Sequence, residues 1–258
     1  MEKIQSVAIE AAKDAGVVLN ELFASRIKRY EMKTAHDILA EADVRSEDII
    51  LGRIRQAFPE HAILSEEAGE NGKDSEYKWI VDPVDGTINF SRGIDEFCIS
   101  IAVSRNDELA FGLIYEPIRD RLYIGKKGEG ATMNGVKMNV STENVLVNTI
   151  LATDNSSDMS ERVRNLELLA RISPEVRHVR IFGSAALHLA RVAKGEIDAY
   201  YKTTCNYWDN AAGMLLLQEA GGRLTDLTGS PLSKDSRTIV ASNGLVHDEI
   251  LALLSARS

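Results

Sequence analysis

The segment from Asp82 to Thr87 carries the residues best suited to chemistry. A short apolar run places Asp82 at its carboxyl end, and Pro83 fixes φ and forces a turn that brings Asp85 to the same side. Gly86 lets the backbone approach a ligand closely. Thr87 stands where a helix can begin, so local N–H groups are free to bind an anion. The spacing therefore predicts two carboxylates beside an anion-binding stretch of backbone.

Together with the carbonyl oxygen of Val84, these groups are the parts of a site for Mg²⁺ and a phosphate. Asp82 and Asp85 also have a plainer explanation, in which an Asp-Pro turn is followed by a helix cap. Taken alone, the pair favours that structural explanation. The other acidic residues of the chain shift the balance toward a metal site.

Three further acidic residues lie where strands end or helices begin. Glu66 follows a second apolar run, Asp209 opens a segment of small and apolar residues, and Asp43 starts a predicted helix. Each has an ordinary alternative, which is a solvated turn for Glu66 and a helix N-cap for Asp209 and Asp43. Spacing by itself leaves both interpretations open.

The N-terminal half is predicted to hold two helices followed by strands. Apolar residues recur at three- and four-residue steps from Ile4 to Phe23, which indicates a long helix. Residues 33–42 are predicted as a loop or short hairpin, and a second helix is predicted from Asp43 to Phe58, where Pro59 ends it. Short strands are then predicted over residues 62–64, 79–81, 97–103, 110–115 and 121–124.

The C-terminal half alternates between segments with the apolar periodicity of a strand and segments with that of a helix. Strands are predicted over residues 149–153, 176–182, 197–201, 223–226 and 238–242. Helices are predicted over residues 160–172, 185–193 and 210–220, and from residue 246 onward. The whole pattern predicts an α+β fold with layered packing. We expect an N-terminal half over residues 1–145 and a C-terminal half over residues 146–258, tightly fused, with the site between them.

Composition excludes several classes of protein. A chain of 258 residues with 44% hydrophobic and 27% charged residues is typical of a globular protein rather than a disordered or fibrous one. The net charge of -9 argues against nucleic acid and anionic membranes as partners. Two cysteines, Cys98 and Cys205, exclude a disulfide framework and a zinc site made of cysteine alone. No apolar run approaches the roughly 20 residues that span a bilayer, and the first residues lack the apolar core of a signal peptide, so a cytoplasmic location is expected.

The motifs resemble those of one family when they are read in order. Asp82–Asn89, with Glu66–Glu67 upstream and Trp208–Asp209 downstream, resembles the inositol monophosphatase family of lithium-sensitive, fructose-bisphosphatase-like phosphatases. The resemblance covers nearly the whole chain. It extends to the segments Asp37–Asp43, Gly183–Ala186 and Glu219–Gly222.

The resemblance implies a layered αβαβα sandwich, a homodimer and a Mg²⁺-dependent phosphatase. One Mg²⁺ would be held by Glu66, Asp82 and the carbonyl oxygen of Val84, and a second by Asp82, Asp85 and Asp209. A third, weaker Mg²⁺ would lie near Glu66, and Mn²⁺ is the expected substitute metal. Carboxylate oxygens are the hard ligands that Mg²⁺ prefers, and paired metals stabilise the attacking and leaving oxygens of an in-line displacement.

The same resemblance assigns roles around the metals. Glu66 and Thr87, with Asp43 behind Thr87, would orient the water that acts as the nucleophile. Backbone N–H groups of Gly86 and Thr87 would hold the phosphate, with Asp85 beside it. No phosphoenzyme is implied.

Substrate recognition departs from the best-known members of the family. In the animal inositol monophosphatases an acidic side chain before the Trp-Asp motif binds inositol hydroxyls, and the matching position here is Lys202. A cation is a poorer partner for a neutral polyol and a good one for a second phosphate. Archaeal relatives often hydrolyse both inositol 1-phosphate and fructose 1,6-bisphosphate, so both substrates are expected; the alternative for Lys202 is a solvated surface lysine. The expected substrate contacts are Gly183, Ser184, Ala185, Lys202 and Arg180.

Two alternatives remain beside this interpretation. One is a relative specific for histidinol phosphate or 3′-phosphoadenosine 5′-phosphate, against which the compact length and Lys202 argue. The other is a regulatory binding protein without turnover, against which the complete set of acidic residues argues. An RNA-associated role is attached to a bacterial relative, but the net charge of -9 gives it no support here.

Overall fold

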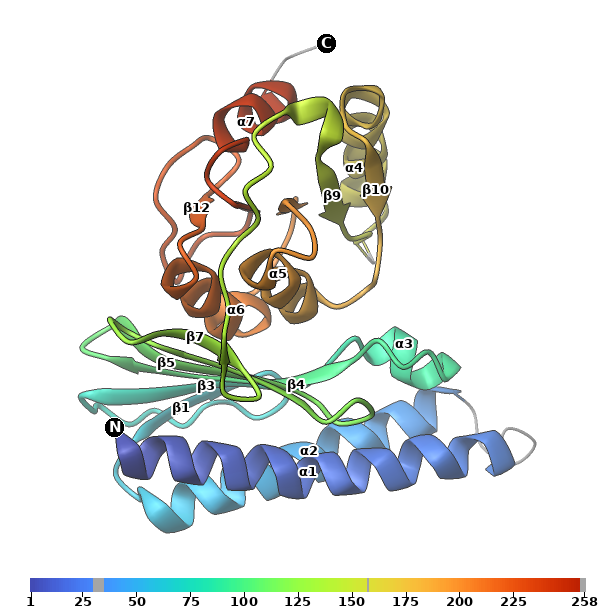
Figure 1. Ribbon diagram of the computed structural model, residues 1–258. Coiled ribbons are helices and arrows are strands. Elements are labelled where there is room, and N and C mark those ends of the chain that lie inside the picture. The colour runs from blue at the N-terminus through green and yellow to red at the C-terminus, as the bar shows by residue number, and fades with distance from the viewer. Residues whose placement is uncertain (30–34, 157, 256–258) are drawn as a thin grey trace.

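The computed structural model describes residues 1–29, 35–156 and 158–255. Within these residues the elements stack in five layers (Figure 1). Helices α1 (Glu2–Arg29) and α2 (Ala35–Ala57) cover one face of an eight-stranded sheet. Helices α5 (Ala185–Lys194) and α6 (Tyr207–Glu219) lie between that sheet and a five-stranded sheet, whose outer face carries α4 (Met159–Ile172) and α7 (His247–Ser255). The fold is therefore α+β, and the predicted αβαβα sandwich is confirmed.

The larger sheet has the strand order β2-β1-β3-β4-β5-β6-β7-β8. Its strands are β1 (Ala62–Ser65), β2 (Gly69–Glu70), β3 (Tyr77–Asp85), β4 (Cys98–Arg105), β5 (Glu108–Glu116), β6 (Arg121–Lys126), β7 (Gly130–Met133) and β8 (Val136–Lys137). β1 and β3 run parallel, with Ser65 opposite Val81, while β3 and β4 run antiparallel. The carboxyl ends of β1 and β3 therefore meet at one edge of the sheet.

Both faces of this sheet are buried at its centre. Trp79 and Val81 pack into the hydrophobic cluster with α1 and α2, whereas Ile80 joins the cluster with α5 and α6, because successive strand side chains point to opposite faces. Gly112 in β5 lets α6 approach closely, since a Cβ there would lie 2.8 Å from the carbonyl oxygen of Ala212. Polar residues suited to chemistry accordingly lie at the strand ends.

The smaller sheet has the strand order β10-β9-β11-β13-β12. Its strands are β9 (Ile150–Thr153), β10 (His178–Arg180), β11 (Ala199–Lys202), β12 (Arg223–Thr225) and β13 (Ile239–Ser242). The remaining elements are α3 (Thr87–Arg92) and the single-turn helices η1 (Leu146–Asn148) and η2 (Ser173–Glu175). β10, β9 and β11 run parallel, so their ends, including Lys202, point toward one side of the sheet.

The structure corrects several details of the sequence prediction. Residues 35–42 belong to α2 rather than to a loop, so Asp43 lies inside the helix and not at its N-cap; residues 33 and 34 lie outside the described residues. This stretch contains no Gly or Pro, and its three Ala, one Leu and one Glu favour helix. Asp209 is likewise not an N-cap, because Asn206 occupies that position of α6. The prediction missed β2, β7 and β8, which are short and contain few large apolar residues.

The larger sheet is formed by residues before position 145 and the smaller sheet by residues after it. The hydrophobic core nevertheless includes residues from both parts of the chain. One cluster contains Ile80 and Ile114 of the larger sheet together with Leu189 and Leu216 of the central helices. We therefore propose that residues 1–145 and 146–258 fold as one unit. None of the described helices is long and apolar enough to cross a membrane.

Candidate active site

Glu66 and Asp82 meet where β1 and β3 end. Because the two strands are parallel and in register, the residue after β1 lies beside the end of β3, and the N–H of Glu66 donates to the carbonyl oxygen of Val81 at 3.2 Å. The carboxyl groups of Glu66 and Asp82 interact closely enough that each shifts the pKa of the other. The N–H of Val84 donates to Asp82 Oδ1 at 3.1 Å, within a register shift that ends the regular pairing of β3 with β4. This irregularity shifts the register, so that Asp85 at the end of β3 pairs with Cys98 at the start of β4.

Asp85 is held by the start of α5, from the other half of the chain. Its Oδ2 accepts hydrogen bonds from Ser184 Oγ at 2.6 Å and from the N–H of Ala186 at 2.7 Å, and its Oδ1 accepts from the N–H of Ala185 at 3.2 Å. A carboxylate at a helix N-terminus is stabilised by the unpaired N–H groups there. The predicted contacts Ser184 and Ala185 therefore bind Asp85 in this structure.

Asp209 lies in the first turn of α6, opposite the end of β11. Its Oδ2 accepts from the N–H of Asn206 at 3.2 Å and from Lys202 Nζ at 3.4 Å. The Lys202 side chain is 18% exposed and that of Asp209 is 14% exposed. Lys202 is thus a largely buried partner of an acidic residue and not a solvated surface lysine.

Glu66, Asp82, Asp85 and Asp209 form one acidic cluster that interacts electrostatically. Burial raises the pKa of Glu66 to about 7, and the charges of Asp209 and Asp85 act in the same direction. Burial, reinforced by the charges of Asp85 and Glu66, raises the pKa of Asp82 well above its usual range. Burial also raises the pKa of Asp85 to about 6, although a side-chain hydrogen bond and the charge of Lys202 oppose it. Such a cluster favours a cation, which would stabilise the ionised forms of Glu66, Asp82 and Asp85.

The donor set of the acidic cluster fits Mg²⁺, which takes hard oxygen ligands. Among the described residues, no three Asp, Glu, His or Cys side chains already converge as metal ligands. Instead, the oxygens of Asp85 and Asp209 bind protein donors, chiefly Ser184 and Lys202. A cation that binds Asp209 Oδ2 would therefore approach the ammonium group of Lys202.

Buried polar residues of α2 support the cluster, and spacing in the sequence did not single them out. Glu47 Oε1 accepts from Ser65 Oγ at 2.5 Å and from the N–H groups of Glu67 and Ala68 at 3.2 and 3.1 Å, which fixes the turn that carries Glu66. Ser46 Oγ, one residue earlier, donates to the carbonyl oxygen of Pro83 at 2.8 Å. Asp43 lies three residues before Ser46 and four before Glu47, so the three side chains lie on one face of the helix. This spacing is the sequence signal that could have identified that face.

Asp43 itself is buried on the same helix. Its Oδ1 has no hydrogen-bond partner among the described residues. Burial raises its pKa to about 7, and the charges of Glu66, Glu67 and Glu47 add to the effect. An unpaired buried carboxyl oxygen beside the Glu66 turn is available to a water or a cation.

A cavity of about 260 Å³ opens beside Asp85. Its lining includes the predicted residues Gly86, Thr87, Gly183, Ala185 and Lys202, together with Ile88, Asn89, Asp154, Asn155 and Ile181. Gly86 has φ of 97°, and a Cβ at this position would lie 2.7 Å from the carbonyl oxygen of Glu96 and 3.1 Å from Phe97 Cα, so only glycine is tolerated there. Arg180 does not line this cavity; its side chain is exposed and donates to the carbonyl oxygen of Val179.

The turn before α5 is fixed by a buried network around Asp154 and His188. The N–H of Gly183 donates to Asp154 Oδ1 at 3.1 Å, and Tyr200 Oη donates to Asp154 Oδ2 at 3.0 Å. His188 Nδ1 lies 3.2 Å from Asp154 Oδ2, and His188 Nε2 accepts from the N–H of Phe182 at 3.2 Å. Asp154 therefore positions the floor of the cavity, a role that no sequence motif indicated.

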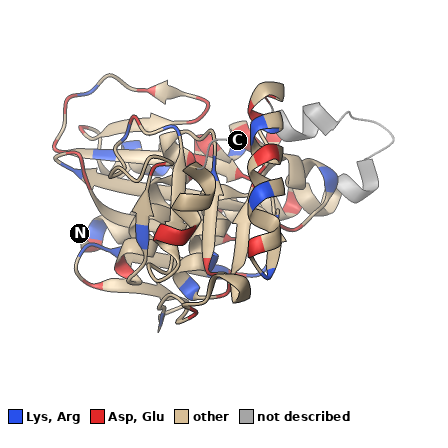
Figure 2. Ribbon diagram, turned by 90° about the horizontal axis from the view of Figure 1, so that it is seen from above, with Lys and Arg blue, Asp and Glu red and all other residues tan. Residues whose placement is uncertain are grey.

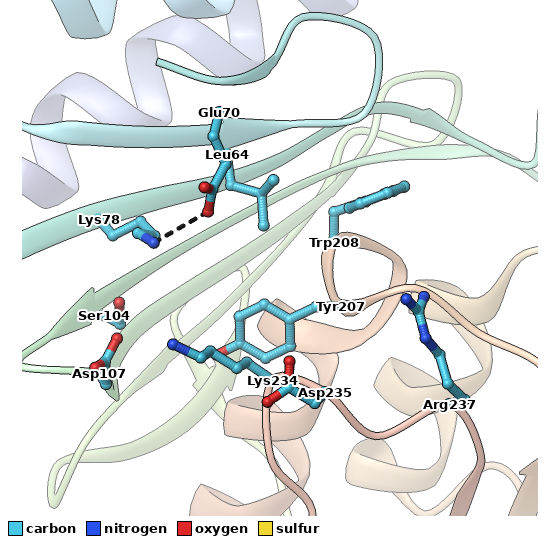
Figure 3. A pocket seen from close by; sticks show the side chains of 10 residues that line it. All are labelled: Leu64, Glu70, Lys78, Ser104, Asp107, Tyr207, Trp208, Lys234, Asp235 and Arg237. Atoms are coloured by element: carbon cyan, nitrogen blue, oxygen red, sulfur yellow. Dashed lines mark hydrogen bonds and ion pairs between the residues drawn. The ribbon is translucent and has the colours of Figure 1, made fainter. Parts of the chain in front are cut away.

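A second cavity, of about 210 Å³, lies beside the start of α6 (Figure 3). Tyr207 and Trp208 form part of its wall, and Lys78 makes an ion pair of 3.2 Å with Glu70 there. Its charged lining residues are balanced between basic and acidic: Lys78, Lys234, Arg237, Glu70, Asp107 and Asp235. The two cavities share no lining residue, and the clustered carboxylates mark the first one as the candidate active site.

Comparison with known proteins points to one family. The model of the inositol monophosphatase family matches residues 1–258. The chain is 37% identical over 249 residues to an inositol-1-monophosphatase of Mesorhizobium japonicum, covering 95% of this chain and 94% of that protein. It is 34% identical over 254 residues to a protein of Pasteurella multocida named Nus factor SuhB, covering 97% and 95%. Among solved structures, the extragenic suppressor protein suhB of Bartonella henselae matches with a TM-score of 0.91 and 32% identity, covering 99% of both chains.

Proposed function

We propose that this chain, which belongs to the inositol monophosphatase family, is a Mg²⁺-dependent phosphatase of inositol 1-phosphate and fructose 1,6-bisphosphate. The observation that carries the proposal is the acidic cluster, one member of which, Asp85, lines a cavity of about 260 Å³ together with Lys202. An acidic cluster alone would repel a phosphate ester, so it suits this substrate only when cations are bound.

The residues proposed to hold Mg²⁺ are Glu66, Asp82, Asp85 and Asp209, with the carbonyl oxygen of Val84. Bound Mg²⁺, or Mn²⁺ in its place, supplies Lewis acidity toward the phosphate ester and its attacking water. A third, weaker ion near Glu66 is part of the proposal. Asp82 is 3% exposed and lies at the centre of the set, so it is the residue whose loss should affect the metals most.

The other residues proposed for the reaction position water and substrate. Glu66 and Thr87 would orient the water, with the buried carboxyl of Asp43 near Glu66. The backbone of Gly86 and Thr87, beside Asp85, would bind the transferred phosphate where α3 begins. This arrangement requires no covalent intermediate.

The remaining substrate contacts are proposed around the cavity. Gly183, Ala185 and Lys202 line it directly, whereas Ser184 is 1% exposed and acts through Asp85. Lys202 is the proposed partner of the second phosphate of fructose 1,6-bisphosphate. Arg180, which is exposed outside the cavity lining, is the weakest of these proposals.

The test is phosphate release by purified protein with Mg²⁺ or with EDTA, on both substrates side by side. Mg²⁺-dependent turnover of both is expected, and Asp82→Asn should abolish it while the circular dichroism spectrum stays unchanged. Wild-type activity in Asp82→Asn would refute the metal assignment. Turnover of inositol 1-phosphate alone would remove fructose 1,6-bisphosphate from the proposal. Failure on both would direct the assay to histidinol phosphate and 3′-phosphoadenosine 5′-phosphate.

Lys202→Glu separates the two substrates. An acidic side chain at this position should lower activity on fructose 1,6-bisphosphate more than on inositol 1-phosphate, because it repels the second phosphate. An unchanged ratio of kcat/KM values would show that Lys202 has no part in the choice of substrate.

A regulatory role without turnover is the second candidate. The observation in its favour is the similarity to the protein named Nus factor SuhB. Against RNA as the partner, basic residues are interspersed with acidic ones over the described elements (Figure 2), and the net charge is -9. A gel-shift assay at physiological salt is expected to show no RNA binding, and a specific shift would support the second candidate. We also propose a homodimer, which light scattering would show as twice the monomer mass.

A further inference from the structure

The ammonium group of Lys202 interacts electrostatically with three acidic residues, namely Asp209, Asp154 and Asp85. Asp154 accepts hydrogen bonds from the N–H of Gly183 and from Tyr200 Oη, and its Oδ2 lies 3.2 Å from His188 Nδ1. Asp85 accepts from the start of α5 through both of its oxygens. Asp209 has fewer donors, and it is the residue that Lys202 contacts, at 3.4 Å. The lysine therefore pairs with the carboxylate that the protein otherwise satisfies least.

We propose that the ammonium group of Lys202 is an internal cation that competes with a divalent metal ion for Asp209. The inference rests on the proposed function, in which Asp209 is a metal ligand. When the metal binds Asp209, Lys202 is released into the cavity that it already lines and becomes available to an anionic group of the substrate. Metal binding and anion recognition are then coupled through one side chain.

Electrostatic repulsion between the metal ion and the Lys202 ammonium group favours binding of one or the other at Asp209, rather than of both at once. A metal ion on Asp209 Oδ2 would lie within a few ångströms of the lysine nitrogen, and two cations at that separation repel strongly where water is largely excluded. The side chains of Lys202 and Asp209 are 18% and 14% exposed, so solvent screens this repulsion only in part. The four-carbon stem of lysine is flexible enough for the ammonium group to move away while the strand stays in place.

The effect of Lys202 on the affinity for Mg²⁺ can be measured by removing its positive charge. Replacing Lys202 by Met keeps the length of the side chain and removes one positive charge beside the metal ligand. The affinity for Mg²⁺ should then rise on the order of tenfold, because a unit charge a few ångströms from a divalent ion has about this effect in a partly solvated site. Lys202→Arg keeps the charge and should stay within about twofold of the wild type.

The test is isothermal titration calorimetry of the whole protein with MgCl₂ alone. Lys78→Met is the matched control, since Lys78 makes an ion pair of 3.2 Å with Glu70 in the other cavity and its loss changes the net charge equally (Figure 3). This variant should bind Mg²⁺ as the wild type does. Lys202→Met should have no effect when Asp209→Asn is also present, because the contested carboxylate is then absent.

The outcomes separate this inference from the proposed function. Unchanged or weaker Mg²⁺ binding by Lys202→Met, with clear binding by the wild type, overturns the competition and leaves the metal site intact. Absence of Mg²⁺ binding by the wild type overturns both. Equal gains in Lys202→Met and Lys78→Met would show a general charge effect and would also overturn the competition.

A second measurement uses the wild-type chain and avoids any question of folding. Amine-selective labelling, read by mass spectrometry, should modify Lys202 several-fold faster in MgCl₂ than in EDTA, because the ammonium group leaves Asp209. The labelling rate of Lys78 should not change. Equal labelling of Lys202 under both conditions would overturn the proposal.

Discussion

Replacing Glu47 by Ala should weaken both the fold and the candidate metal site, although Glu47 is not a proposed ligand. The side chain is 7% exposed, and its Oε1 accepts hydrogen bonds from Ser65 Oγ, at 2.5 Å, and from the N–H groups of Glu67 and Ala68. These bonds connect α2 to the turn that places Glu66. Without them, the turn loses its attachment to the helix.

The magnitude follows from the three donors. A hydrogen bond to a charged acceptor contributes about 1.5–3 kcal/mol. Ser65 is fully buried and would be left unpaired, whereas Glu67 and Ala68 are exposed, so water can replace the lost acceptor at their N–H groups. The expected loss in the free energy of unfolding is therefore about 2–4 kcal/mol, less than the full sum of three bonds. Glu47→Gln keeps one carbonyl oxygen as acceptor and should lose about 1 kcal/mol.

The assay is urea unfolding in EDTA, followed by Mg²⁺ titration of the folded protein. Asp48→Ala is the control, since Asp48 is an exposed acidic residue on the same helix and its loss should change the stability by less than about 0.5 kcal/mol. Mg²⁺ affinity should fall in Glu47→Ala and not in Asp48→Ala. Equal stability and equal Mg²⁺ affinity in the two variants would refute the reasoning.

Three other predictions concern the backbone, pH and metal binding. Gly86→Ala should abolish activity and lower stability, because φ is 97° and a Cβ would lie 2.7 Å from the carbonyl oxygen of Glu96; activity and melting temperature near wild type would contradict this. Burial lowers the pKa of His247 from 6.5 to about 4, so its contribution to stability is complete above pH 6.5 and is lost as the pH falls toward 4. His247→Gln, which cannot titrate beside Ser242, should have a flatter stability profile between these pH values, and parallel urea-unfolding profiles would argue against it. Excess MgCl₂ should raise the melting temperature of the wild type and not that of Asp82→Asn, and a rise in both would place the metal elsewhere.

The sequence predicted most of the elements that bury their side chains regularly. The strands around Trp79 and Ile101 and the helices α4 to α7 show clear apolar periodicities, and the structure contains each of them. The start of α2 was missed, because residues 35–42 are too few to show a clear helical period. The five-layer arrangement came from family resemblance, since periodicity alone does not specify which faces pack together.

The residue types of the candidate site were also visible in the sequence. Carboxylates at strand ends and helix starts indicated the chemistry of a cation site, because hard oxygen ligands depend on residue type and on where the chain turns. Spacing alone could not distinguish Asp209 as a ligand from Asp209 as a cap. Spacing also could not identify Glu47, because its role is to accept a hydrogen bond from Ser65 at the end of β1, far from Glu47 in the sequence.

The sequence by itself determined which groups are available for chemistry and in what order the chain presents them. Only the tertiary structure determined their partners. Ser184 donates to Asp85 across 99 residues, and Lys202 points at Asp209 rather than at solvent. These contacts depend on how two sheets pack against α5 and α6, and local propensity and periodicity contain no information about such long-range packing.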